Sequence, residues 1–218
     1  MIPTPAEPLP GGPEELRRAV ASGRRDFAGL CLQDLDGVDL DLSGCDLRGG
    51  CFRAARFGRA SLHAALLEGC SFQQALLWGA DLSRARAGGS RWQEADLSAS
   101  RLQQACFDSA LLHRCCLRGV LAAGSSWRQA RLVEADFRSG LDQLTDLGGC
   151  DLGEADLSFA LLQGASLQGS DLRGACLYGA NLAGADLCQA DLSGCDLRDT
   201  DLRGARLHGT VLRNARLP

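Results

Sequence analysis

The chain contains no lysine, so arginine supplies all 23 of its basic residues, against 27 Asp and Glu. It has no apolar run of the roughly 18 residues that a membrane-spanning helix needs, and no basic-plus-apolar leader. We therefore expect a cytoplasmic protein without a membrane partner. Cys-X-X-Cys pairs, phosphate-binding glycine loops and nucleophile motifs are also absent from the sequence. These absences predict a non-catalytic protein with no metal site and no cofactor.

What the sequence does contain is a five-residue repeat. Counting in fives from Phe27, a Leu, Phe or Trp recurs to Leu217, and Gly37, Ala87, Ala122 and Asp142 are the exceptions. Two residues before most of these repeat centres stands a small residue; Asp is commonest just before the centre, and Gly two residues after it. A period of five suits neither an α-helix nor a flat strand, so the chain must turn once per repeat. This pattern predicts a solenoid.

The repeat resembles the pentapeptide-repeat family. The segments that carry the resemblance most clearly are Ala155-Asp156-Leu157, Ala180-Asn181-Leu182, Ala185-Asp186-Leu187 and Ala190-Asp191-Leu192. The resemblance implies an all-β fold, a right-handed quadrilateral parallel β-helix in which four repeats form one coil. At that size of coil the chain would make about ten coils. All six prolines lie outside the repeats, as backbone hydrogen bonding between coils requires.

Composition divides the chain into three parts. Residues 1–12 are rich in proline and without periodicity, and we expect them to be disordered. Residues 13–23 predict a short helix that caps the first coil, since a proline and two acids stand at its start. Residues 26–218 predict the β-helix. Its last coil has no comparable cap, which suggests a monomer or an end-to-end dimer through that coil.

Two irregular features need separate interpretation. Asp142 stands where a buried Leu is expected, and we interpret it as a bulge or small loop that lets the carboxylate leave the core. Most of the 11 cysteines occupy repeat positions that suit small or partly buried side chains, which predicts reduced, structural thiols. Cys188 follows a centre, and we expect it to be exposed.

The acidic residues of the C-terminal half form the first candidate binding surface. Between residues 146 and 201 there are ten acids and two arginines. On stacked coils the aspartates that precede the centres would lie in rows about 4.8 Å apart. These candidate residues are Asp151, Asp156, Asp171, Asp186, Asp191, Asp196 and Asp201.

Exposed apolar residues form the second candidate surface. Trp78, Phe159 and Tyr178 lie outside the centre positions, and counting in twenties places them on one face. Counting in the same way stacks Leu121, Leu141 and Leu161 on another face. Aligned exposed apolar side chains are typical of protein-binding surfaces. Both alignments require that the register of four repeats per coil continues unbroken past Asp142.

These features favour a rod that binds another protein, without direct binding of nucleic acid because its net charge is −4. Our leading hypothesis is a resistance- or immunity-type role, in which the rod neutralises or shields a DNA-acting protein such as a basic nuclease toxin. The first alternative is a DNA mimic that regulates or protects a type II topoisomerase, as some members of the family do. The second is a structural adaptor in a secretion or assembly complex.

Overall fold

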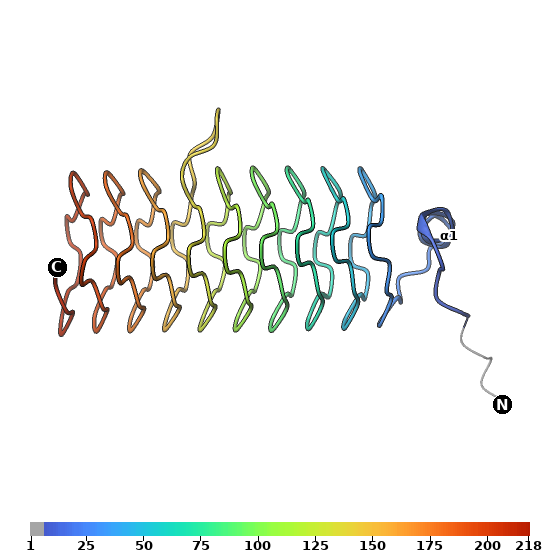
Figure 1. Cartoon of the computed structure of the whole chain (residues 1–218), viewed down its shortest axis with the longest axis horizontal. Helices are drawn as coiled ribbons and strands as arrows, with labels where there is room; N and C mark the ends of the chain where they lie inside the picture. Colours follow the sequence, from blue (N-terminus) through green and yellow to red (C-terminus); the bar gives the residue numbers. More distant parts are fainter. Residues whose placement is uncertain (1–6) are drawn as a thin grey trace.

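The chain forms a straight rod of stacked coils with an α-helix at its N-terminal end (Figure 1). The computed structural model describes residues 7–218. The helix, α1, spans Pro13–Ala21, and from Asp26 to Arg216 the coils are joined by isolated parallel β-bridges. Asp26 pairs with Asp46, and Asp46 with Leu66, so four repeats make one coil.

Four columns of bridges define the four faces of the rod. Face 1 runs from Asp26 to Val211, face 2 from Cys31 to Arg216, face 3 from Asp36 to Asp201, and face 4 from Asp41 to Arg206. A two-residue turn follows each face in the coils, except after Asp136 on face 3. We call the stack of turns after face 2 corner 2 and the stack after face 3 corner 3. The parallel four-sided arrangement agrees with the fold that the repeat predicts.

The core contains the side chains of the repeat centres and of the small residues two positions earlier. Leu182 is fully buried and Ala180 is 1% exposed. Aromatic centres stack on neighbouring coils, with ring centroids 4.4 Å apart for Phe107 and Trp127. The Trp127 indole N–H donates to the Ser125 hydroxyl at 2.6 Å, so the small position also satisfies the one polar atom of a buried ring.

Each turn contains one residue in the left-handed region. Positive φ occurs two residues after the centre throughout the repeats, at 17 glycines and 19 other residues, and the exceptions are Ser139 and Leu144. The frequent glycines follow from this requirement, because glycine has no Cβ to oppose a positive φ.

The aspartate before each centre stabilises the turn that follows. In Asp171 the carboxylate accepts the backbone N–H of Arg173 at 3.0 Å, and the Asn181 amide oxygen accepts the N–H of Ala183 at the same distance. Where an arginine stands at the third position, its guanidinium also donates to the carboxylate, as Arg173 does at 2.9 Å. Aspartate at this position is therefore a structural residue of the repeat, whatever else it does.

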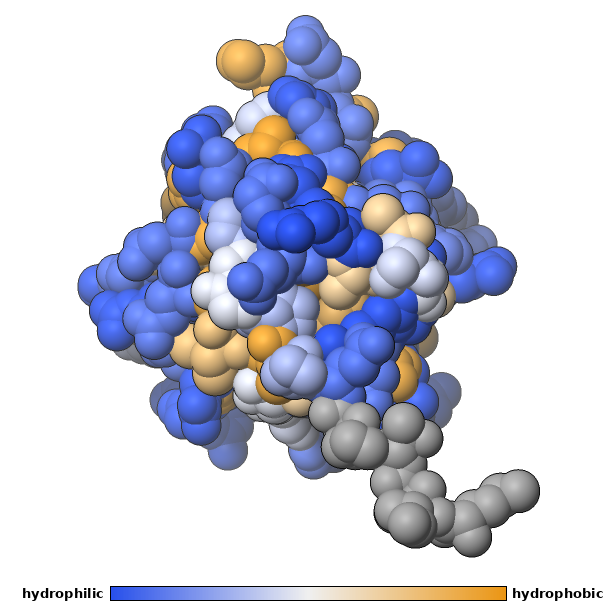
Figure 2. Space-filling model, turned by 90° about the vertical axis from the view of Figure 1, so that its right-hand side faces the viewer, coloured by the Kyte–Doolittle hydropathy of each residue, from blue (hydrophilic) through white to orange (hydrophobic). Residues whose placement is uncertain are grey.

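Helix α1 covers the N-terminal end of the core. Leu16 is fully buried and Val20 is 9% exposed, and both belong to the same apolar cluster as the coils. Arg17 fastens the helix by donating to the Val38 carbonyl at 3.2 Å. Viewed onto this end, the surface is mostly hydrophilic (Figure 2). The helix expected over 13–23 thus ends two residues earlier, at Ala21.

The segment before the helix, for which we expect disorder over residues 1–12, is described only in part. Residues 1–6 lie outside the described part of the chain, and residues 7–12 follow a defined path. The Arg24 guanidinium donates to the carbonyls of Glu7 at 3.0 Å and Pro8 at 2.8 Å, and Pro10 is buried. Residues 7 and 8 are thus held by a side chain from the link between α1 and the first coil, a contact that composition alone does not reveal.

One insertion interrupts the rod. Cys116 pairs with Asp136, four repeats further on, but Leu121 pairs with Asp146, five repeats further on. The additional repeat forms a loop that projects from corner 3, visible as the single excursion in Figure 1. The bulge expected at Asp142 is confirmed, since Asp142 is exposed in this loop. After the loop, Thr145 takes the small inward position and is fully buried.

At the C-terminal end the apolar column is open. In the last coil the centres Leu207, Leu212 and Leu217 are 41%, 37% and 59% exposed, whereas Leu182 and Leu187 in the preceding coil are fully buried.

Replacing a buried centre by an acid should unfold the stack. We expect Leu182→Asp to lower the unfolding temperature sharply, because an unpaired buried carboxylate costs several kcal/mol. The matched substitution Leu212→Asp, at a partly exposed centre of the last coil, should have a much smaller effect. Thermal unfolding followed by circular dichroism compares the two; equal unfolding temperatures would contradict the assigned core.

The Asp-Leu-Arg turns should respond to acid. Hydrogen bonding from Arg198 lowers the pKa of Asp196 from 3.8 to about 2. Because folding lowers this pKa, the turn's contribution to stability is complete above pH 3.8 and is lost as the pH falls toward 2. An NMR titration of the Asp196 carboxyl should show a midpoint near 2 that rises in Arg198→Gln and stays unchanged in Arg213→Gln. A midpoint near 3.8 in the unaltered protein would contradict the pairing.

Candidate protein-binding surfaces

The predicted acidic rows form only one continuous column. Asp151, Asp171 and Asp191 pair directly on face 1. On face 2, Cys176 separates Asp156 from Asp196. Asp186 lies on face 4 and Asp201 on face 3. The seven aspartates are half-buried and spread over all four faces, so they do not form a single negative surface.

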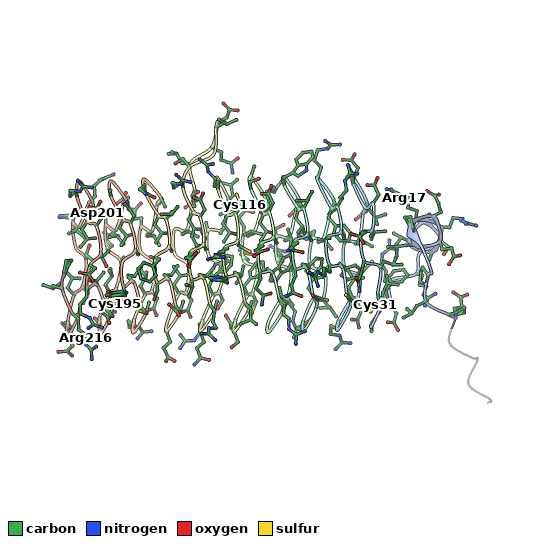
Figure 3. All side chains as sticks on the ribbon, viewed as in Figure 1. Arg17, Cys31, Cys116, Cys195, Asp201 and Arg216 are labelled. Atoms are coloured by element: carbon green, nitrogen blue, oxygen red, sulfur yellow. The ribbon has the colours of Figure 1, made fainter. Side chains whose placement is uncertain are left out.

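Arginines pair with five of the seven aspartates. The nitrogen–oxygen distances are 3.2 Å for Arg128–Asp151, 2.5 Å for Arg173–Asp171, 3.1 Å for Arg206–Asp186, 2.6 Å for Arg198–Asp196 and 2.7 Å for Arg203–Asp201. Figure 3 shows such side chains along the outside of the rod, with Asp201 and Arg216 near the C-terminal end. Within the described residues, Asp156 and Asp191 have no arginine partner. The local charge is therefore weaker than the excess of acids suggests.

An aromatic pair lies on corner 2 beside one of these unpaired acids. The rings of Phe159 and Tyr178 meet edge to face with centroids 5.4 Å apart, and the Arg198 guanidinium lies 5.7 Å from the Tyr178 ring centroid. Phe159 is 51% exposed, and a hydrogen bond to Asp199 raises the pKa of the Tyr178 phenol. Asp156 precedes the same turn as Phe159. We call Asp156, Phe159, Tyr178, Arg198 and Asp199 the corner-2 cluster.

The backbone makes specific room for this cluster. Phe159 has a φ of 59°, a conformation that is unfavourable for a bulky side chain. Its ring lies across Gly179, where an added Cβ would stand 2.6 Å from the Phe159 Cε1 atom. The exposed phenylalanine thus depends on a glycine in the next coil.

Trp78 lies on a different corner from the aromatic pair, so the prediction that all three share one face is wrong. Its ring covers Gly58 on corner 3, with the Arg59 guanidinium 5.0 Å from the ring centroid. Trp78 is 40% exposed. The insertion of one repeat shifts every later residue by one face, which moves Tyr178 away from the column of Trp78.

The predicted stack of Leu121, Leu141 and Leu161 is also wrong for the same reason. Leu121 pairs with Asp146 on face 4, and Leu161 pairs with Asp136 on face 3. Leu141 belongs to the loop, where it is 103% exposed. Counting in twenties therefore assigns residues beyond the one-repeat insertion to the wrong face.

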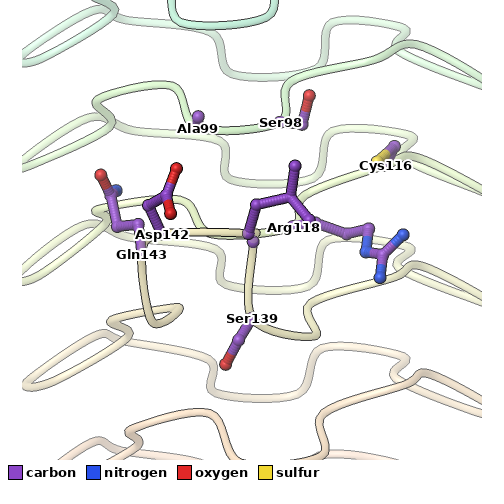
Figure 4. A pocket seen from close by; sticks show the side chains of 9 residues that line it. Ser98, Ala99, Cys116, Arg118, Ser139, Asp142 and Gln143 are labelled. Carbon is purple, nitrogen blue, oxygen red and sulfur yellow. The ribbon is translucent and has the colours of Figure 1, made fainter.

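The loop borders two hollows on the described surface, and sequence reasoning missed them. One, of about 530 Å³, lies between the loop and Ser98, Ala99, Cys116 and Arg118 (Figure 4). The other, of about 880 Å³, lies between the loop and Leu121, Ser166 and Gln168. In the sequence, Asp142 at a centre position indicated the loop. It did not indicate which residues of the rod would lie against the loop.

The cysteines and other possible ligands form no site in residues 7–218. All 11 thiols are free, and Cys188, which we expected to be exposed, is 7% exposed. Among these residues no three His, Cys, Asp or Glu side chains gather in a way that could hold a metal ion. Nor does the described chain include a helix that is long and apolar enough to span a membrane.

This architecture is similar to that of known proteins. The family model for pentapeptide repeats matches eight copies, over residues 41–79, 79–114, 143–179 and 180–217. The crystal structure of HetL, a pentapeptide repeat protein involved in heterocyst differentiation regulation from the cyanobacterium Nostoc sp. strain PCC 7120, is similar with a TM-score of 0.77 and 33% identity over 94% of each chain.

Two other solved structures are less similar. Rfr23 from the cyanobacterium Cyanothece 51142 is 34% identical over 47% of this chain and 63% of its own, with a TM-score of 0.38. QnrB1, a plasmid-mediated fluoroquinolone resistance protein, is 20% identical over 85% and 89%, with a TM-score of 0.46. A search of curated protein sequences returned no match. Since the family model matches more than half of the residues and HetL is similar along nearly the whole rod, the chain belongs to the pentapeptide-repeat proteins, which form right-handed quadrilateral β-helices.

Proposed function

We propose that this chain is a non-catalytic rod that binds another protein through the corner-2 cluster and thereby neutralises or shields it. The single observation that carries the proposal is the exposed Phe159–Tyr178 pair. Aromatic side chains and arginine are enriched among the residues that contribute most to protein–protein binding, and here Tyr178 contacts both Phe159 and Arg198.

The exposed ring of Phe159 strengthens this interpretation. The turn position of Phe159 has a left-handed backbone, as at 18 other non-glycine residues, and this costs about 1 kcal/mol relative to the ordinary conformation. That position requires no aromatic side chain, and half of Phe159 remains exposed. A partner that covered the ring would bury the exposed apolar surface.

The acids of the cluster favour a basic partner. Asp156 has no arginine partner among the described residues, and Asp199 contacts the Tyr178 phenol. These two carboxylates would steer a positively charged protein toward the aromatic pair. A DNA-acting protein, for example a nuclease toxin, has the required charge, so we propose a resistance- or immunity-type role.

The other circumstances agree with this proposal. HetL is described as a protein involved in the regulation of differentiation, a role that binding alone can perform. Eleven free thiols suit a reducing compartment, which supports a cytoplasmic location. The topoisomerase-directed mimic receives less support, because arginines neutralise most of the aspartates that would imitate phosphates.

Removing the aromatic pair should abolish partner capture. We expect Phe159→Ala/Tyr178→Ala to weaken binding at least about thirtyfold, since each anchor of this kind contributes about 2 kcal/mol or more. The measurement is affinity capture from lysate of the source cells, followed by titration of the purified partner. Trp78→Ala, which removes an exposed aromatic ring from corner 3, is the control and should bind normally. Equal loss in both variants, or in neither, would overturn the assignment to corner 2.

Removing the charge of the cluster should affect the rate of association. We expect Asp156→Asn/Asp199→Asn to slow association about tenfold at low salt and to change dissociation little. Asn181 shows that asparagine maintains the turn at the position of Asp156, and the φ of 57° at Asp199 is one that asparagine adopts readily, so the fold should not change. Surface plasmon resonance at two salt concentrations measures both rates. Unchanged association at low salt would remove the reason for proposing a basic partner.

A further inference from the structure

The loop between faces 3 and 4 is held in a fixed shape although it lies outside the repeat. The two sides of the loop meet where the Gly140 N–H donates to the Gln143 carbonyl at 2.8 Å. Leu141 and Asp142 lie between them at the tip. At its base the Gly119 N–H donates to the Thr145 hydroxyl at 2.9 Å, and that hydroxyl donates to the Arg138 carbonyl at 3.0 Å. A loop fixed in this way presents its tip in one position.

The tip and the chain that returns from it are unusually apolar for such an exposed segment. Leu141 is 103% exposed and Leu144 is 69% exposed, the two highest values among the large apolar residues of the described chain. Leu144 borders the larger hollow, of about 880 Å³, together with Leu121 on face 4. Apolar side chains therefore line a groove that lies beside an exposed apolar tip.

The same groove contains two carboxylates without a cationic partner. Asp142 and Asp146 both border it, and no arginine of the described residues forms a salt bridge with either. Arg118, which borders the smaller hollow, points away from the Asp142 carboxylate (Figure 4). The Arg118 Nε atom instead lies 3.7 Å from the Asp136 Oδ2 atom. This arrangement contrasts with the acidic columns, where arginines pair with most of the aspartates.

We propose that this groove binds an arginine or lysine side chain from an extended segment of a partner protein. The aliphatic stem of the side chain would lie on Leu121 and Leu144, and its cationic head would meet Asp142 and Asp146. Leu141 would contact an apolar neighbour in the same segment. This site lies apart from the corner-2 cluster, and its existence does not depend on the function proposed above.

The insertion allows an unusually clean test, because it is one repeat long. Deleting residues 140–144 joins Ser139 to Thr145, so a small inward residue and Asp146-Leu147 follow at the spacing of the repeat. The deletion variant should fold as an uninterrupted rod. A second variant, Asp142→Asn/Asp146→Asn, leaves the loop in place. The asparagine that replaces Asp146 can still accept the Gly148 N–H, which the Asp146 carboxylate accepts at 2.9 Å.

The probes are two blocked pentapeptides, acetyl-Leu-Arg-Leu-Arg-Leu-amide and the same peptide with uncharged citrulline in place of arginine. In NMR titrations of the full chain, the arginine peptide should saturably shift the amide signals of Asp142, Asp146 and Gln168. Its affinity should exceed that of the citrulline peptide about tenfold, as expected for a charge-assisted contact. The double asparagine variant should lose this preference, and the deletion variant should lose the binding.

Three results would overturn the proposal. These are equal affinity for the two peptides, shifts that map away from the loop, and the absence of saturable shifts. If the deletion variant did not fold, the double asparagine variant would decide the question alone, since it retains every backbone contact of the loop. Because the peptides contain no natural partner, failure of this test would not affect the corner-2 proposal, and failure of partner capture would not affect this one.

Discussion

The fixed pairing of each residue with the residue one coil further on is the constraint on which the rest of this structure depends. Backbone hydrogen bonds join adjacent coils on all four faces, as between the Leu182 N–H and the Asp201 carbonyl at 2.8 Å. This pairing requires that every coil turn four times at the same places. The inward small residue, the apolar centre, the left-handed turn residue and the aspartate that accepts the turn N–H all follow from it.

The same constraint determines which irregularities the rod can tolerate. An insertion that stayed within the stack and was not a whole repeat would move apolar centres to the surface and small residues out of the corners. The loop adds one repeat, so Thr145 and Leu147 occupy inward positions without further adjustment. On the outside of the rod, each side chain after the loop lies one face away from the face that counting in twenties without the insertion would give. The insertion therefore leaves the pattern of the core unchanged, but it changes which side chains are neighbours on the surface.

This difference explains what the sequence could and could not predict. The centres and small positions are buried by physical necessity, so the period identified the core and the bulge at Asp142, whereas the coil of four repeats came from the family resemblance. Outward residues such as Trp78 and Tyr178 obey no such rule, and their neighbours depend on the register across the loop. Cys188 was misplaced because its burial depends on neighbouring turns and not on its position in the repeat. The pairing of Arg128 with Asp151 was likewise hidden, since the two residues belong to different coils.

Surface features that the repeat itself explains carry little information about function. An aspartate before a centre accepts a turn N–H wherever it occurs, and asparagine performs the same role at Asn181. The informative residues are those whose side chains the repeat does not require: Phe159, with an exposed ring, and Leu141, at the tip of a loop held by hydrogen bonds. Neither side chain is fully buried in the folded rod. Selection for folding alone would not favour either residue, and this is why we place the partner-binding surfaces at these two points.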